Sequence, residues 1–276
     1  MPKTIFYNGK FYKENSRIFP ISDRSVFFGD AVYDAMMGHD GGIFLCEEHL
    51  ERLLSNAKRI GIVSNYSIIQ LRDILFNVVK KSKLKEYFLY IQLSRCSSER
   101  CHAYPADQGT ALLITANNIT LSPREKRLKL ITVDDKRYGF CNIKTVNLLP
   151  NVIASHTATS AGCDEAVFVR GNVVTECAHS NISVIKDGTI LTHPDSQYIL
   201  PGIAKKRLFA AATEIGIPVI ERPFSLAELF DADEVLITST TKICLAACEL
   251  NGRPVGGKDE KTLSELQNFL FSEYKC

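Results

Sequence analysis

The segment Cys141–Asn151 places a single cation among apolar side chains. In the run CNIKTVNLLPN, Lys144 follows Ile143 and precedes Val146 and Leu148. Apolar surroundings favour the uncharged amine of a lysine, and an uncharged amine can form a Schiff base with an aldehyde. The spacing alone leaves a second interpretation open, in which Lys144 lies at a strand edge with its ammonium group in water.

A second segment, Thr175–Asn181, carries an acid among small side chains. Glu176 follows a short run of β-formers in the sequence TECAHSN. A carboxylate in such a position can keep the nitrogen of an aromatic heterocycle protonated, so that negative charge spreads into the ring. Taken alone, Glu176 could equally be a solvated turn residue.

Together these segments resemble the pyridoxal-phosphate enzymes of fold type IV, which include D-amino-acid and branched-chain aminotransferases and aminodeoxychorismate lyase. The resemblance runs over nearly the whole chain, from ISDRSVFFGDAVYDAM at 21–36 to ITSTTKI at 237–243. It implies an α+β fold of two domains. These are a small α/β N-terminal domain and a larger C-terminal domain with a mixed or antiparallel, barrel-like sheet and helices.

The resemblance also implies pyridoxal 5′-phosphate as the cofactor and assigns roles to the residues that would bind it. Lys144 would hold the cofactor as a Schiff base and move a proton during catalysis, and Glu176 would face the pyridine nitrogen. The remaining residues would bind the phosphate or pack on the ring; they are Arg52, Leu200, Gly202, Ile203, Ala204, Ser239 and Thr240. No metal site is expected.

These residues have ordinary structural alternatives when each is taken singly. Arg52 could pair with Glu48 one helical turn away. Gly202 could simply form a turn, and Ser239-Thr240 could end a strand. Their joint occurrence in the order of the family favours the cofactor site.

The loop Arg95–Gly109 distinguishes among members of the family. Arg100 and His102 resemble the Arg-x-His pair of D-amino-acid aminotransferases, in which a loop of the partner subunit and a tyrosine, here Tyr33, bind the substrate carboxylate. A solvated loop with an incidental Arg and His is the alternative. The resemblance implies transamination of D-amino acids such as D-alanine with a 2-oxo acid such as 2-oxoglutarate, in a homodimer with shared active sites.

Two other activities remain open from the sequence: aminodeoxychorismate lyase, and then a branched-chain aminotransferase. Several residues depart from the pattern of D-specific enzymes and leave the substrate range undecided. His179 stands where those enzymes carry small residues, and Ala204 replaces a residue with a hydroxyl. Met36-Met37 would form an adaptable wall beside the substrate.

Composition excludes several other classes of protein. The 276 residues predict about two domains, and 45% hydrophobic with 23% charged residues is typical of a globular chain. A net charge of +2 gives no reason to expect a nucleic-acid partner, and no apolar run is long enough for a membrane span. Nine cysteines without a C-x-x-C pair indicate free thiols and a cytoplasmic protein.

Hydrophobic periodicity predicts a small α+β domain over residues 1–118, a linker over 119–128 and a larger domain over 129–276. The first forty residues are predicted to be strand and turn. Helical periods are predicted over 47–60, 68–79, 146–161, 203–215, 225–230 and 262–274. Strands are predicted over 4–7, 10–12, 87–93, 111–115, 128–133, 165–170, 173–175, 182–185, 189–192, 219–220 and 235–238.

The sequence matches one nucleotide-binding motif in its spacing but lacks one of the residues that the motif requires. Gly252–Lys258 fits G-x-x-x-x-G-K, but Asp259 stands where Ser or Thr would hold Mg²⁺. Asn251-Gly252 is better interpreted as a hairpin turn.

Overall fold

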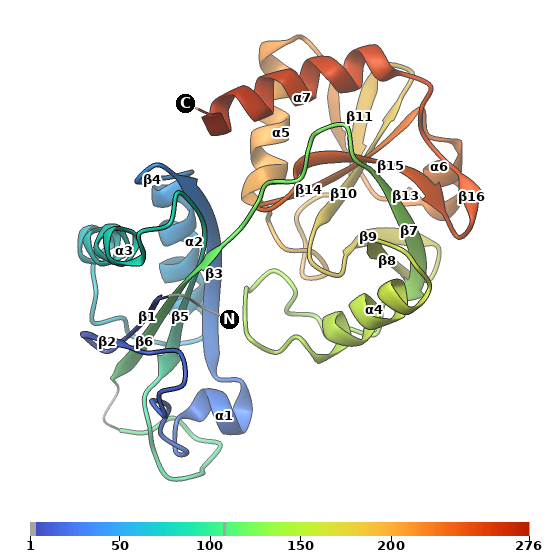
Figure 1. The fold of residues 1–276 in the computed structure, drawn as a ribbon. Coiled ribbons are helices and arrows are strands. Elements are labelled where there is room, and N and C mark those ends of the chain that lie inside the picture. Colours follow the sequence, from blue (N-terminus) through green and yellow to red (C-terminus); the bar gives the residue numbers. More distant parts are fainter. Residues whose placement is uncertain (1–3, 107–108, 276) are drawn as a thin grey trace. The chain divides into compact units, whose positions relative to one another are not determined.

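The computed structural model describes residues 4–106 and 109–275, and the chain divides into two compact units (Figure 1). The first unit comprises Met1–Thr120 and Ile143–Asn147, and the second comprises Leu121–Asn142 and Leu148–Cys276. The division near residue 120 falls inside the predicted linker at 119–128. The return of Ile143–Asn147, and with it Lys144, to the first unit has no counterpart in the predicted boundaries.

The first unit is built on an antiparallel sheet. Its described strands lie in the order β2-β1-β6-β5-β3-β4. Asn8 and Gly9 join the first two strands with φ values of 44° and 85°, as the predicted hairpin requires. The strands are β1 Thr4–Tyr7, β2 Lys10–Tyr12, β3 Ala31–His39, β4 Gly42–Ile43, β5 Glu86–Arg95 and β6 Thr110–Asn118.

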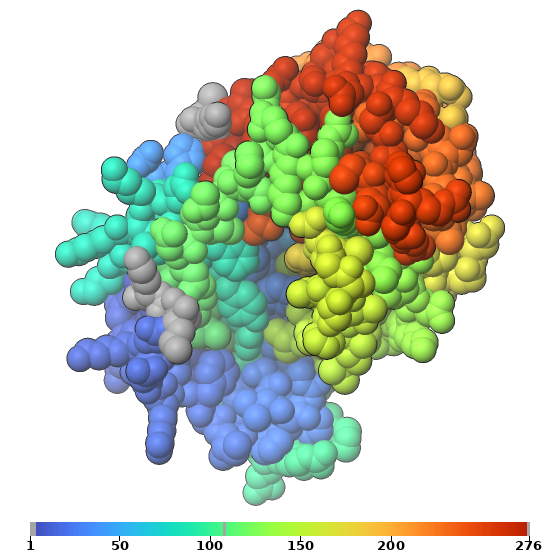
Figure 2. All heavy atoms as spheres, turned by 45° about the vertical axis from the view of Figure 1, so that its right-hand side comes forward, coloured from blue at the N-terminus to red at the C-terminus, as the bar shows by residue number. Residues whose placement is uncertain are grey.

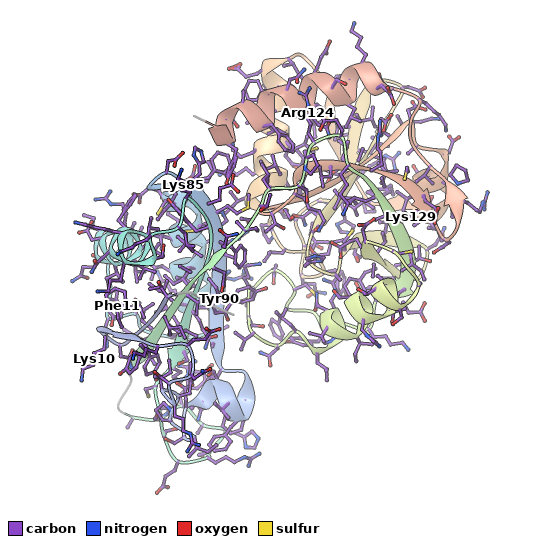
Figure 3. The ribbon with its side chains drawn as sticks, in the orientation of Figure 1. Lys10, Phe11, Lys85, Tyr90, Arg124 and Lys129 are labelled. Carbon is purple, nitrogen blue, oxygen red and sulfur yellow. The ribbon has the colours of Figure 1, made fainter. Side chains whose placement is uncertain are left out.

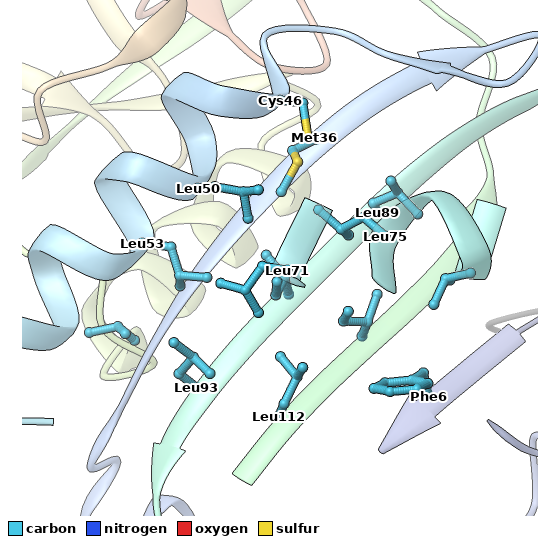
Figure 4. Close-up of a cluster of buried hydrophobic side chains, with 14 of the residues drawn as sticks. Phe6, Met36, Cys46, Leu50, Leu53, Leu71, Leu75, Leu89, Leu93 and Leu112 are labelled. Carbon is cyan, nitrogen blue, oxygen red and sulfur yellow. The ribbon is translucent and has the colours of Figure 1, made fainter. Parts of the chain in front are cut away.

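Two amphipathic helices supply the core of the first unit. They are α2, Cys46–Arg59, and α3, Ile68–Ser82. Ser67 begins α3 with a capping box, because its hydroxyl accepts from the Gln70 N–H while the Gln70 side chain accepts from the Ser67 N–H. The helices pack leucines on the strands, as Figure 4 shows; those labelled there are Leu50, Leu53, Leu71 and Leu75 from the helices and Leu89, Leu93 and Leu112 from the sheet.

A short helix, α1, spans Arg24–Phe28, where the sequence predicts only strand and turn. The prediction is wrong here because five residues are too few to show a helical period. Asp23 begins the helix by accepting from the Ser25 N–H at 2.8 Å. Gly29 ends it at a φ of 63°, and a Cβ at this position would lie 2.3 Å from Asn147 Oδ1.

The second unit contains a mixed sheet, whose described strands follow the order β12-β11-β10-β14-β15-β7-β8-β9-β13 with β16 beside β15. The sheet curls, because β9 and β10 stand far apart in this order and yet contact each other. The predicted α+β fold with a barrel-like sheet is confirmed. The strands are β7 Arg127–Asp134, β8 Glu165–Arg170, β9 Val173–Cys177, β10 Asn181–Lys186, β11 Thr189–Thr192, β12 Val219–Glu221, β13 Phe224–Ser225, β14 Glu234–Ser239, β15 Ile243–Leu250 and β16 Arg253–Pro254.

Helices cover this sheet. The helices are α4 Leu149–Ser160, α5 Ile203–Glu214, α6 Leu226–Asp231 and α7 Glu260–Lys275. The first of them packs on β7 and β8, while α5 and α7 pack on each other and on β15. The red C-terminal segment that includes α7 lies on the surface in the view of Figure 2, and its leucines at 263, 266 and 270 are buried. None of the described helices is both long and apolar enough to cross a membrane.

The segment Gly252–Lys258 forms a hairpin and its continuation. Asn251 and Gly252 have φ values of 53° and 73° and turn the chain from β15 into β16, where Leu250 pairs with Arg253. The Lys258 ammonium donates to the backbone oxygens of Asp231 and Ala232. The predicted hairpin is confirmed.

Leu71 tests the packing of the first unit. Its side chain has no exposed surface, whereas Ile69 on the same helix is 61% exposed. Leu71→Ala is expected to lower the free energy of unfolding by about 2–5 kcal/mol, because it leaves a cavity in the core. Ile69→Ala is the control, with an expected change of about 0.5 kcal/mol or less in chemical unfolding. Equal effects of the two substitutions would contradict this account of the core.

Candidate active site

Glu176 lies near the end of β9 in the second unit and is almost fully buried. One carboxylate oxygen accepts from the guanidinium of Arg137. The other accepts from Asn181 Nδ2 at 3.1 Å and from the backbone N–H of Leu200 at 3.0 Å. Donors on both oxygens favour the ionised form of a buried carboxylate.

Arg137 is itself held by a second acid. Asp135 accepts from Arg137 Nε at 2.9 Å and from Nη2 at 3.0 Å, and the guanidinium lies 4.2 Å from the ring centroid of Phe168. Burial raises the pKa of Asp135, but the hydrogen bonds and charge of Arg137 outweigh this effect and lower it. Sequence reasoning missed Arg137, because DDKR resembles an ordinary charged turn.

Asn181 joins the predicted residues of the second unit to one another. Besides its bond to Glu176, its amide donates to the Leu200 carbonyl at 2.9 Å. A Cβ on Gly202 would lie 1.8 Å from Asn181 Oδ1, so only glycine fits there. Asn181 also pairs with Thr238, the residue before Ser239. Glu176, Leu200 and Gly202 therefore lie around one amide, with the end of β14 beside them.

The N-terminus of α5 offers backbone donors next to this group. Gly202 is the N-cap and has no side-chain cap, while Ile203 and Ala204 form the first turn. The first N–H groups of a helix carry partial positive charge and are suited to bind an anion. Ala204 has lost the hydroxyl of the family pattern but keeps its position in this turn.

Ser239 ends β14 and Thr240 begins the turn to β15, and both are half-buried. The Lys242 N–H donates to the carbonyl of Ser239 at 3.3 Å and to its hydroxyl oxygen at 3.2 Å. The second unit thus combines a buried carboxylate, an uncapped helix start and a hydroxyl-bearing turn. This donor and acceptor set fits a ligand with a phosphate group and a basic ring nitrogen.

In the first unit, Lys144 lies against Tyr33. The Tyr33 N–H donates to the Lys144 carbonyl at 2.9 Å, and Lys144 Nζ lies 4.5 Å from the centroid of the tyrosine ring. Tyr33 stacks in turn on Tyr90, which Figure 3 labels, at a centroid distance of 5.3 Å. Lys144 is half-buried. Its amino group therefore lies over the face of the Tyr33 ring.

The main partner of Arg52 is Asp34, and not Glu48 as in the alternative interpretation. The Arg52 guanidinium binds Asp34 at two points, each at 2.8 Å, and His49 Nδ1 lies 2.7 Å from the same carboxylate. Burial raises the pKa of Asp34, but Arg52 and His49 outweigh it and hold the value well below the usual range. Because side chains alternate along a strand, Asp34 and Tyr33 leave β3 on opposite faces.

Arg100 and His102 lie together on an exposed loop of the first unit. The Arg100 guanidinium carbon lies 5.3 Å from the ring centroid of Phe28, and the His102 ring lies 5.2 Å from it. Arg24 holds the loop by donating to backbone oxygens of Cys101, His102 and Ala103. Asp107 and Gln108 of the predicted loop lie outside the described residues.

Comparison with known proteins identifies the family. The family described as amino-transferase class IV matches residues 31–250, about four-fifths of the chain. This chain belongs to that family. The predicted family is therefore confirmed, and the protein is an enzyme, a class IV aminotransferase.

Relatives and solved structures agree with this membership. A D-alanine aminotransferase of Staphylococcus epidermidis is 33% identical over 98% of this chain and 97% of its own. A branched-chain aminotransferase of Thermoproteus uzoniensis has a TM-score of 0.88 at 21% identity, covering 99% of this chain and 96% of its own. The branched-chain amino acid aminotransferase from Escherichia coli has a TM-score of 0.87 at 21% identity, covering 99% of this chain and 94% of its own. At these identities the two structures bear on the fold alone.

The pair of Arg137 and Glu176 can be tested by its contribution to stability. Arg137→Met leaves the buried Glu176 without this cation and Asp135 with Arg170 at 3.3 Å, and it is expected to lower the free energy of unfolding of the aminotransferase by about 3–5 kcal/mol. Arg222→Met removes an exposed pair with Glu228 and is expected to cost about 1 kcal/mol or less. Chemical unfolding of both variants measures the difference. A loss for Arg137→Met no larger than that of the control would show that Glu176 does not depend on Arg137.

Proposed function

We propose that this class IV aminotransferase uses pyridoxal 5′-phosphate to transaminate D-amino acids such as D-alanine, with a 2-oxo acid such as 2-oxoglutarate as acceptor. The buried carboxylate of Glu176, with donors on both oxygens, beside the start of α5 is the observation that carries the cofactor assignment. The choice of D-amino acids is supported by the D-alanine aminotransferases among the relatives.

The second unit supplies residues for both ends of the cofactor. Backbone N–H groups of Ile203 and Ala204, with hydroxyls of Ser239 and Thr240, bind the phosphate. The family resemblance assigns Arg52 to the same dianion, for which a guanidinium is a suited donor. Glu176 keeps the ring nitrogen protonated, and the bound cofactor then supplies an electron sink for the charge that forms on the substrate.

Leu200 provides a contact with the ring, and Lys144 carries out the proton transfer. Leu200 packs on the ring, and its N–H holds Glu176 at 3.0 Å. Lys144 would hold the cofactor through Nζ. Its amine would also accept the proton that leaves the substrate Cα.

Tyr33, Arg100 and His102 bind the α-carboxylate of the substrate. A guanidinium, an imidazole and a phenol are chemically suited to this anion. Arg100 and His102 act on the site of the partner subunit in a homodimer, which explains why the loop is fastened by Arg24 and yet exposed. We further place the protein in the cytoplasm, an assignment supported by the eight described cysteines, all of which are free.

Stereochemistry tests the substrate assignment. The purified enzyme loaded with pyridoxal 5′-phosphate is mixed separately with D-alanine and L-alanine, and the absorbance of the bound cofactor is followed without acceptor. D-alanine is expected to change the spectrum at least about tenfold faster, because the carboxylate and Lys144 fix the direction of proton transfer. A faster reaction with L-alanine would contradict D-specificity.

Two controls accompany this measurement. Lys144→Ala is expected to bind the cofactor without a borohydride-reducible link, since the amine that forms the link is missing. A link that persists at one lysine in this variant would mean that Lys144 is not the attachment residue. Release of pyruvate from aminodeoxychorismate without any 2-oxo acid would instead favour the lyase.

Mixing two inactive variants tests the shared site. Arg100→Ala damages the carboxylate clamp that one subunit lends, and Lys144→Ala removes the amine of the other. Mixed dimers that regain intact sites should recover up to about a quarter of the wild-type activity, because about half the molecules are mixed and each carries one intact site. Absence of recovery after confirmed subunit exchange would argue against shared sites.

A further inference from the structure

A second ionic cluster lies in the second unit, outside the roles proposed so far. It consists of Glu165, His179 and Lys242. The Glu165 carboxylate, which has no exposed surface, lies 2.7 Å from His179 Nδ1 and accepts from Lys242 Nζ at 3.1 Å. Lys242 Nζ also lies 3.3 Å from His179 Nε2, so the three side chains close a ring of contacts.

The contacts orient the His179 ring. Lys242 carries only donors, so His179 Nε2 accepts from it, and Nδ1 faces Glu165 as the donor. His179 thus bridges Lys242 and Glu165. Burial raises the pKa of Glu165, but His179 and Lys242 outweigh this and lower it. His179, although 56% exposed, is therefore engaged at both ring nitrogens.

The three residues come from different parts of the curled sheet. Glu165 begins β8, His179 lies between β9 and β10, and Lys242 lies between β14 and β15. The contact of Glu165 with His179 continues the pairing of β8 with β9. The strand order separates β8 from β14 by two other strands, so the contacts of Lys242 cross the curl. Ser180 adds a further link, since its hydroxyl donates to Glu165 at 2.9 Å.

Both segments joined by this cluster carry residues of the proposed cofactor site. Glu176 lies three residues before His179, and Ser239 lies three residues before Lys242. The Lys242 backbone N–H donates to Ser239, so the same residue fixes the turn and reaches across to Glu165. The cluster therefore adds side-chain links between the Glu176 segment and the Ser239-Thr240 turn, beside the backbone pairing of Asn181 with Thr238.

We propose that Lys242, Glu165 and His179 are positioning residues, which set the affinity for pyridoxal 5′-phosphate by holding these two segments at a fixed separation. This inference rests on the proposed function, because that function assigns the two segments to opposite ends of one cofactor. The cluster touches neither the substrate nor the reacting atoms in this proposal. The bulky His179 is thereby a structural bridge of this chain and not a group that narrows the substrate pocket.

The test measures the affinity of the full-length protein for pyridoxal 5′-phosphate by equilibrium dialysis, with melting temperature recorded in parallel. Lys242→Met keeps the length of the side chain and removes the ammonium. Its affinity is expected to fall about 10- to 100-fold, the range typical of lost supporting contacts around a bound group. Lys242→Arg, which can still reach Glu165, is expected to recover most of the loss.

Arg127→Met is the matched control. Arg127 pairs with Glu234, a carboxylate without exposed surface at the opposite end of β14 from Ser239. This variant also strips a buried acid of a cation, so it is expected to lower the melting temperature while cofactor affinity stays within about twofold. An equal loss of affinity in Arg127→Met would attribute the effect to general destabilisation and overturn the proposal.

A double variant tests the proposal in the case that Lys242→Met does not fold. Glu165→Gln with Lys242→Met removes both charges, so no unpaired charge stays buried, and the same loss of affinity is expected. Wild-type affinity in either variant would overturn the positioning role while leaving the proposed function intact. Failure of the wild-type protein to bind pyridoxal 5′-phosphate would overturn the proposed function itself.

Discussion

The second unit is organised around a carboxylate that is almost fully buried, that of Glu176. Removing such an ion from water costs several kcal/mol unless cations and hydrogen-bond donors replace the lost solvent. For Glu176 the replacements are Arg137, Asn181 and the backbone of Leu200. These partners belong to three separate stretches of chain. Their convergence on one side chain brings together the end of β9, the start of β10 and the approach to α5.

The same requirement explains the arrangement behind Arg137. A guanidinium buried beside one acid would add its own desolvation cost, and Asp135 offsets that cost with two further hydrogen bonds. In the first unit, Asp34 plays the comparable part for Arg52 with two bonds of 2.8 Å. Each arginine is thus oriented by an acid behind it. A planar guanidinium fixed in this way presents its remaining face in one direction.

The sequence predicted the elements with strong periods and missed those that depend on distant partners. Helix α3 and strand β8 have regular patterns, and strand β8 has the predicted bounds. Helix α1 is too short for a period, and β15 begins at Ile243, which has the unusual φ of 54°. Among the site residues, Lys144 and Glu176 stand out by residue type. The role of Arg137 depends on its contact with Glu176, 39 residues away, and no local pattern reveals that contact.

Residues 143–147 belong to the first unit although they lie within the sequence of the second. The chain leaves the first unit near Thr120, returns for five residues and leaves again. Within that return, Thr145 bridges to Val32 and the Lys144 carbonyl accepts from the Tyr33 N–H. A recombinant fragment that stops at residue 120 would expose these backbone groups of β3 and lack the lysine altogether. A fragment meant to reproduce this unit would have to include residues 143–147, joined to residue 120 by a designed linker.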